Sequence, residues 1–313
     1  MSRIAVVDLG TNSTRLLVAD AVDGALTELE RRTVVTRFGE GVDATGRLAD
    51  AAIARVEEAL GAYRAVIDRL GAETVVAVAT SAMRDAENGD EFRDNVRARF
   101  GIDLVTISGN EEARLSFRGA TAVRTEGAPT VVIDIGGGST EYVIGRPRGD
   151  PSFHVSTRMG SVRHTERFIA HDPPDDDEVA ALAADAERIV EAEVPDDLRS
   201  QTQHGIAVAG TATTLAAIDQ ELDPYDPDRV HGYRLGLQAG ERILAMLAAL
   251  PLAERRAVKG LHPDRAPTIV AGAAILMESL RTFGLEEVEV SEADILHGAA
   301  LAAADGSFPQ PGV

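Results

Sequence analysis

Residues 4–14 read IAVVDLGTNST, and the same pattern returns at residues 130–140 as TVVIDIGGGST. In each copy an apolar run ends on an aspartate, passes through glycine and small hydroxyl residues, and resumes as a second apolar run, which is typical of a β-hairpin. Glycine lets an anion approach the backbone N–H groups closely, and an aspartate at the strand end can hold a cation. The repeat therefore predicts two facing turns that clamp a metal–phosphate group between two halves of the molecule.

Composition indicates a soluble globular enzyme. The 313 residues are enough for two domains that each bury a core. The formal net charge of −20 argues against a general nucleic-acid binder, which needs a basic surface. The sequence has no cysteine, no apolar run close to the ~18 residues of a membrane-spanning helix, and no signal-peptide pattern at its start. We therefore expect a cytoplasmic enzyme without nucleic-acid or membrane partners.

The order of the expected elements indicates an α/β fold in both halves of the chain. Strand-like and helix-like patterns alternate on either side of residues 125–129, which read TEGAP and form the first convincing linker. We predict an N-terminal domain at residues 1–125 and a C-terminal domain at residues 126–313, each with a mixed sheet. The last helix, at about residues 293–305, is a candidate to pack back on the first domain.

The two turns supply the groups that a metal–phosphate complex requires. Their glycines expose backbone N–H groups, and small hydroxyl side chains add donors: Thr11, Ser13 and Ser139. Three carboxylates are hard oxygen ligands suited to Mg²⁺, directly or through its waters: Asp8, Asp134 and Glu141. Two matched copies, one opening each half, favour phosphate binding over a purely structural hairpin.

A third segment, residues 209–214 with the sequence AGTATT, stands between an expected strand and an expected helix. The free N–H groups at a helix N-terminus favour an anion. Gly210 and Thr211 are therefore candidate phosphate-binding residues. A capped helix start explains the segment equally well, so both interpretations stay open.

Residues 108–114, SGNEEAR, open another expected helix. Ser108 and Glu111 have the spacing of a capping box, which gives Glu111 a structural role. Glu112 has no such role and is a candidate general base that accepts a proton from water during phosphate hydrolysis. Acidic residues are also favoured in the first turn of any helix, so the sequence leaves this role of Glu112 open.

Loop arginines near the phosphate turns would bind a polyanion. The candidates are Arg84, Arg114, Arg118 and Arg163. The acidic run at residues 172–178 is expected to be a solvated loop and helix start, and the histidines lack the spacing of a zinc site. Neither a Walker phosphate loop nor a dinucleotide-binding glycine motif is present.

These segments, taken together, resemble the exopolyphosphatase/guanosine pentaphosphate phosphatase (Ppx/GppA) family, within the superfamily of actin-like, hexokinase-like and Hsp70-like ATPases. The motifs that carry the resemblance, in chain order, are DLGTNS at 8–13, TSAMRD at 80–85, ISGNEEAR at 107–114, DIGGGSTE at 134–141, GSVR at 160–163, AGTAT at 209–213, VHGYR at 230–234 and DRAPTIVAG at 264–272. They span almost the whole chain.

The resemblance implies an α/β fold of two actin-like (ribonuclease H-like) domains whose mixed sheets flank a catalytic cleft. It places the catalytic glutamate at Glu112 and Mg²⁺, with Mn²⁺ as a substitute, near Asp134 and Glu141. The expected phosphate-binding residues are Gly10, Thr11, Asn12, Ser13, Arg84, Gly136, Gly137, Gly138, Ser139, Gly210 and Thr211. The expected metal ligands are Asp8, Asp134 and Glu141.

The activity implied is Mg²⁺-dependent hydrolysis of the terminal phosphate of inorganic polyphosphate, with short to medium chains as the first choice. A guanosine pentaphosphate 5′-phosphohydrolase acting in the stringent response is the alternative, so the partner is polyphosphate or a (p)ppGpp-type nucleotide. A small-metabolite kinase and a non-catalytic polyphosphate or alarmone sensor are alternatives of other classes. A homodimer is also expected.

Two departures from the family pattern affect these expectations. The chain is expected to lack the C-terminal helical domains with which longer relatives hold long polyphosphate. Residues 291–298 read SEADILHG, where many relatives have a Leu-Arg-Glu-Gly pattern, so no C-terminal arginine is assigned a role.

Overall fold

Each copy of the repeated segment forms two neighbouring strands joined by a tight turn, which confirms both predicted hairpins. The strands are β1 (Ser2–Leu9) with β2 (Ser13–Val22), and β6 (Thr130–Ile135) with β7 (Thr140–Gly145), antiparallel in both pairs. A hydrogen bond from a glycine N–H to a serine carbonyl closes each turn, from Gly10 to Ser13 at 3.0 Å and from Gly136 to Ser139 at 3.0 Å. The two turns therefore share one backbone hydrogen bond at equivalent positions.

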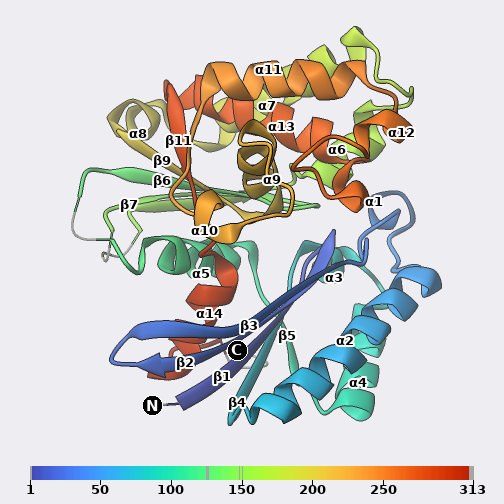
Figure 1. Ribbon diagram of the computed structural model, residues 1–313, viewed down its shortest axis with the longest axis vertical. Helices are drawn as coiled ribbons and strands as arrows, with labels where there is room; N and C mark the ends of the chain where they lie inside the picture. Colours follow the sequence, from blue (N-terminus) through green and yellow to red (C-terminus); the bar gives the residue numbers. More distant parts are fainter. Residues whose placement is uncertain (1, 125–126, 148, 150, 310–313) are drawn as a thin grey trace. The chain divides into compact units, whose positions relative to one another are not determined.

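The computed structural model describes residues 2–124, 127–147, 149 and 151–309, and the chain forms two compact units (Figure 1). The first unit consists of Met1–Val123 and Asp294–Val313, and the second of Arg124–Ala293. The last helix, α14 (Ile295–Asp305), thus belongs to the first unit. Residues 125 and 126 of the predicted linker lie outside the described residues.

The sheet of the first unit has the order β3-β2-β1-β4-β5. The added strands are β3 (Ala25–Val35), β4 (Thr74–Ala79) and β5 (Leu104–Thr106). Strand β4 runs parallel to β1 and β5 runs parallel to β4, whereas β2 and β3 are antiparallel to their neighbours. Because adjacent parallel strands end at the same edge of a sheet, the segments that follow β4 and β5 start close together.

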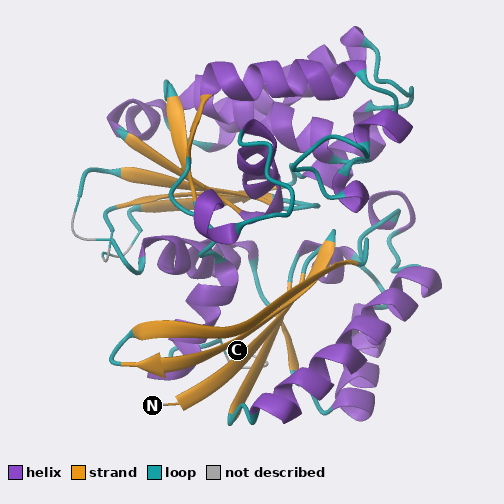
Figure 2. Ribbon diagram, viewed as in Figure 1, coloured by secondary structure: helices purple, strands orange, loops and turns teal. Residues whose placement is uncertain are grey.

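Side chains of β1 alternate between two apolar cores, as the period of a strand requires. Ala5, Val7 and Leu9 face the core built with α2 (Asp50–Leu70) and α4 (Gly89–Phe100). The intervening side chains of β1 face the core that contains α14 and residues of α5 (Gly109–Thr121). Helices therefore cover both faces of this sheet (Figure 2). The short helices α1 (Val42–Thr45) and α3 (Ser81–Asp85) complete the unit.

The second sheet has the order β10-β11-β9-β6-β7-β8, so its arrangement around β6 repeats the arrangement around β1. Its other strands are β8 (Phe153–Thr157), β9 (His204–Val208), β10 (Arg234–Gly236) and β11 (Glu287–Val290). Its helical segments are α6 (Ser161–Phe168), α7 (Asp176–Glu193), α8 (Asp196–Gln201), α9 (Ala209–Asp219), α10 (Pro227–Val230), α11 (Leu237–Ala249), α12 (Leu252–Arg255), the 3-10 turn η1 (Pro263–Arg265) and α13 (Ile269–Phe283). Both sheets contain parallel and antiparallel pairs, which confirms the predicted α/β class with mixed sheets.

Helices α5 and α14 of the first unit touch backbone to backbone. A Cβ added at Gly119 would lie 1.9 Å from the carbonyl oxygen of Asp294, and one added at Gly298 would lie 1.8 Å from that of Leu115. Both glycines are therefore required for the close approach of the two helices. No helix in the described ranges is both long enough and apolar enough to cross a membrane.

Gly298→Ala should lower the free energy of unfolding by about 1–3 kcal/mol, because the added methyl group has no space and overpacking forces the helices apart. Urea-induced unfolding measures this difference. The matched control is Gly61→Ala in α2, where the nearest atom to an added Cβ is Phe100 Cε1 at 3.8 Å. That control should be neutral or stabilising, since alanine favours a helix over glycine by up to about 1 kcal/mol. Wild-type stability in Gly298→Ala would contradict the backbone contact.

Candidate functional site

The first predicted phosphate turn, residues 10–13, is held by hydrogen bonds to its surroundings in the first unit. The hydroxyl groups of Thr11 and Ser81 share a hydrogen bond of 2.8 Å, and the carbonyl oxygens of Thr11 and Asn12 accept backbone hydrogen bonds at 2.8 and 2.9 Å. The side chains of Thr11, Asn12 and Ser13 are buried. Ser13 Oγ is buried without a hydrogen-bond partner in the part of the chain that the structure describes, so it is a donor available to a ligand.

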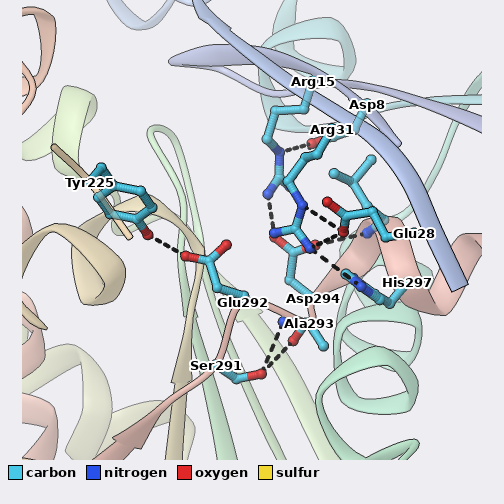
Figure 3. A network of polar contacts seen from close by, with 11 residues as sticks. Asp8, Arg15, Glu28, Arg31, Tyr225, Ser291, Glu292, Ala293, Asp294 and His297 are labelled. Carbon is cyan, nitrogen blue, oxygen red and sulfur yellow. Dashed lines mark hydrogen bonds and ion pairs between the residues drawn. The ribbon is translucent and has the colours of Figure 1, made fainter. Parts of the chain in front are cut away.

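Asp8 lies directly opposite Arg15 at the end of this hairpin (Figure 3). Its buried Oδ2 accepts hydrogen bonds from Arg15 Nε at 2.8 Å and forms an ion pair with Arg15 Nη2 at 2.6 Å. Arg15 Nη1 also binds Asp294. Asp8 Oδ1 has no hydrogen-bond partner among the described residues. Arg15 was not assigned from the sequence, although aligning the two repeats places it at the position of Glu141.

The second predicted phosphate turn, residues 136–139, is bound to the start of α6 through its carbonyl groups. The N–H groups of Ser161 and Val162 donate to the carbonyl oxygens of Gly136 and Gly137 at 2.9 and 2.8 Å. Arg163 Nε donates to the carbonyl oxygen of Gly138 at 2.8 Å. Arg163, a candidate polyanion-binding arginine from the sequence, is buried, and its Nε holds the turn. The carbonyl oxygens of the turn are thus hydrogen-bonded to α6.

Asp134 and Glu141 form a cross-strand pair of carboxylates at the end of β6 and β7. They are directly opposite in the register, and both are buried. Glu141 accepts a hydrogen bond of 2.6 Å from Ser156 Oγ. Like charges directly opposite one another on a sheet are unfavourable, and a divalent cation bound by both carboxylates would offset this repulsion. The donor set therefore fits Mg²⁺, which prefers oxygen ligands.

Glu112 and Arg84 are brought together in the first unit. Arg84 Nη1, at the end of α3, donates to Glu112 Oε2 at 2.8 Å and to the carbonyl oxygen of Ile107 at 2.8 Å. Glu112 is buried, so its carboxylate is held next to a guanidinium in a desolvated position. Arg84 and Glu112 follow the parallel neighbours β4 and β5, which explains why residues distant in sequence meet.

Glu111, the neighbour of Glu112, points back to the start of α5. Its Oε2 accepts a hydrogen bond of 2.8 Å from the N–H of Ser108, and its own N–H donates to Ser108 Oγ at 3.2 Å. The predicted capping box is therefore confirmed. Two adjacent glutamates thus have different environments, and only Glu112 is bound to Arg84.

The third candidate segment is not a separate loop. Helix α9 begins at Ala209, directly after β9, so Gly210 and Thr211 lie in its first turn. Ala209 has a left-handed backbone, φ 64°, which turns the chain into the helix without a connecting loop. A Cβ at Gly210 would lie 1.7 Å from Arg265 Nη1, so the guanidinium of Arg265 covers this glycine. Arg265 belongs to a quoted motif but was not predicted as a site residue.

One further group of possible metal ligands lies on the surface of the second unit. Among the described residues, His171, Asp175 and Glu178 are close enough to share an ion. Glu178 accepts backbone hydrogen bonds from Ala170 at 2.9 Å and Asp175 at 3.1 Å, which together with His171 lower the pKa of Glu178 to about 2. Glu178 therefore helps to cap α7, in agreement with the helix start predicted for the acidic run.

Comparison with known proteins relates this chain to phosphatases over nearly its whole length. Residues 17–305 match the model of the Ppx/GppA phosphatase family. The chain is 39% identical to Exopolyphosphatase 2 of Mycobacterium tuberculosis over 326 aligned positions, covering 97% of this chain and 99% of that protein. It is 29% identical to Exopolyphosphatase 1 of the same species, covering 92% of this chain and 84% of that protein.

Solved structures agree with this relation. A crystal structure of an exopolyphosphatase-like protein superposes with a TM-score of 0.92 at 34% identity, covering 96% of this chain and 97% of that one. The Ppx/GppA family member of Aquifex aeolicus superposes with a TM-score of 0.82 at 30% identity, covering 99% of each chain. On both the sequence match and these superpositions, the chain belongs to the Ppx/GppA phosphatase family.

Proposed function

We propose that this protein is an exopolyphosphatase, which hydrolyses the terminal phosphoanhydride bond of inorganic polyphosphate. Its family membership makes it a phosphoanhydride hydrolase, and its relatives in Mycobacterium tuberculosis carry the name exopolyphosphatase. The observation that carries the proposal is the contact between buried Glu112 and half-buried Arg84, joined by a hydrogen bond of 2.8 Å. A proton acceptor and a phosphate-binding cation are thereby placed in contact.

In the proposed reaction, Glu112 accepts a proton from a water molecule as the water oxygen attacks the terminal phosphorus. The new P–O bond forms in line with the breaking bond to the bridging oxygen, and the shortened chain leaves with the electron pair. The backbone N–H groups of the glycine turns would stabilise the charge on the transferred phosphoryl oxygens.

Arg84 has a second effect in this proposal. A guanidinium beside a carboxylate favours its ionised form and makes it a weaker base. A phosphate group that binds Arg84 would draw the guanidinium away from Glu112, and the carboxylate would then accept a proton more readily. Substrate binding would thus prepare Glu112 for the attack.

Asp134 and Glu141 are the residues that would hold Mg²⁺, and a bound ion would offset the charge of the phosphate oxygens. Asp8 is a different case, because Arg15 already binds its Oδ2. We therefore assign the metal to the second turn. Asp8 would act on a ligand only through Oδ1, which is buried and has no hydrogen-bond partner among the described residues.

Phosphate release in the presence of Mg²⁺ should be measured in parallel from short polyphosphate, long polyphosphate, guanosine pentaphosphate and ATP. We expect release from polyphosphate, fastest from short or medium chains, and little from the nucleotides. Preference for guanosine pentaphosphate would instead place the protein in alarmone metabolism. ADP formation that depends on an added acceptor would identify a kinase, and binding of polyphosphate without turnover would identify a sensor.

Glu112→Gln should lower kcat by about 10²- to 10⁴-fold, the usual contribution of a general base. Polyphosphate should still bind, which a polyphosphate-induced rise in Tm would report. The matched control is Glu111→Gln, which should keep near-normal activity because glutamine can also complete a capping box. Equal losses in the two variants, or normal turnover in Glu112→Gln, would remove Glu112 as the base.

Asp134→Asn should raise the Mg²⁺ concentration for half-maximal activity roughly tenfold or more, because the site loses a charged oxygen ligand. A Mg²⁺ titration of the initial rate measures this change. Asp175→Asn, in the exposed group at the start of α7, is the matched control and should leave the titration unchanged. If both variants titrate like wild type, the metal is held elsewhere.

A further inference from the structure

Arg15 connects two buried carboxylates of the first unit, Asp8 and Asp294 (Figure 3). Asp8 ends strand β1 at the phosphate turn, whereas Asp294 immediately precedes α14, at the point where the chain returns to this unit. The family motifs quoted from the sequence do not include Asp294. A single guanidinium thus joins the phosphate turn to a residue that lies far away in the sequence.

The way Arg15 binds Asp8 is unusual for this pair of groups. An arginine fork commonly binds both oxygens of one carboxylate. Here Nε and Nη2 both lie on Oδ2 of Asp8, and Nη1 is bound to Asp294 instead. Asp8 Oδ1 is consequently left without a hydrogen-bond partner among the described residues, although it is buried. The engagement of Arg15 by Asp294 accounts for this one-sided contact.

Asp294 is itself fixed in place. Its Oδ1 accepts a hydrogen bond of 3.0 Å from the N–H of Leu296, so it caps the N-terminus of α14. Its backbone carbonyl lies against Gly119 of α5. Although burial disfavours its charge, the positive charges of Arg15, His297 and Arg31 lower its pKa, so it stays ionised. A rigid, charged acceptor is therefore presented to Arg15.

We propose that Asp294 is a positioning residue for the hydrolysis: it holds one end of Arg15, so that Arg15 covers only Oδ2 of Asp8 and leaves the buried Oδ1 without a partner among the described residues. Without the charge of Asp294, the guanidinium would turn and bind both oxygens of Asp8. The turn would then lose an acceptor for the substrate complex or its bound water. This inference rests on the proposed function of the same turn.

Asp294→Asn separates the two roles of this residue, because asparagine caps a helix about as well as aspartate but carries no charge. We expect kcat/KM for polyphosphate to fall about tenfold, as is usual when a supporting partner of a functional group is removed. Asp294→Glu, which keeps the charge but is a poorer cap, should be more active than Asp294→Asn even if it is less stable. A purely capping role predicts the opposite order of activities.

The matched control is Asp226→Asn, which removes the charge of another capping aspartate, at the start of α10 in the second unit. It should change neither activity nor Tm appreciably. A double-mutant cycle then tests the connection to Asp8: in an Asp8→Asn background, Asp294→Asn should cause little further loss. Equal fold-losses in both backgrounds would overturn the proposal.

A crystal structure of Asp294→Asn gives a readout that does not depend on activity. We expect Arg15 to bind both oxygens of Asp8 in this variant, and an unchanged contact through Oδ2 alone would overturn the proposal. If the wild type does not hydrolyse polyphosphate but Arg15 binds both oxygens of Asp8 in Asp294→Asn, the result counts against the proposed function and not against the positioning by Asp294. If Asp294→Asn and Asp294→Ser both fail to fold while Asp226→Asn folds, Asp294 serves the fold only and the proposal fails.

Discussion

A carboxylate buried at the end of a central strand must be matched by positive charge, because desolvation of an isolated charge is costly. Both units place such a carboxylate at the same point, as the last residue but one of a strand: Asp8 in β1 and Asp134 in β6. The residue directly opposite is Arg15 in the first unit and Glu141 in the second. The same backbone arrangement therefore surrounds the strand-end aspartate with different charges. The first turn has an arginine opposite it, and the second has a carboxylate, which together with the aspartate is suited to a metal.

Local rules predicted much of this arrangement. The two hairpins follow from the repeated segment, since glycine and small hydroxyl residues between apolar runs specify a turn. The split between Glu111 and Glu112 follows from the capping-box spacing to Ser108. The contact of Glu112 with Arg84 does not follow from local rules alone, because it also depends on β4 and β5 being parallel neighbours.

Other features could not be predicted from local pattern. The abrupt start of α9 depends on the left-handed backbone of Ala209, a conformation that alanine rarely adopts and that nothing in its sequence signals. The position of Arg265 over Gly210 depends on tertiary packing between segments that are far apart in the chain. The contact of Arg15 with Asp294 likewise joins the start of the chain to its last helix. The contacts of Arg265 and Arg15 are long-range, whereas sequence patterns report only on neighbouring residues.

The two turns differ in the charge of the residue that lies opposite the strand-end aspartate. Asp8 and Asp294 share Arg15, so the first turn carries its own cation and is ordered before any ligand arrives. Asp134 and Glu141 lie directly opposite one another, so the second turn places two buried carboxylates where the first turn has an ion pair. Under the proposed function, a divalent cation bound there would offset their negative charge. The exchange of Arg15 for Glu141 is thus what makes the ends of the two hairpins electrostatically different.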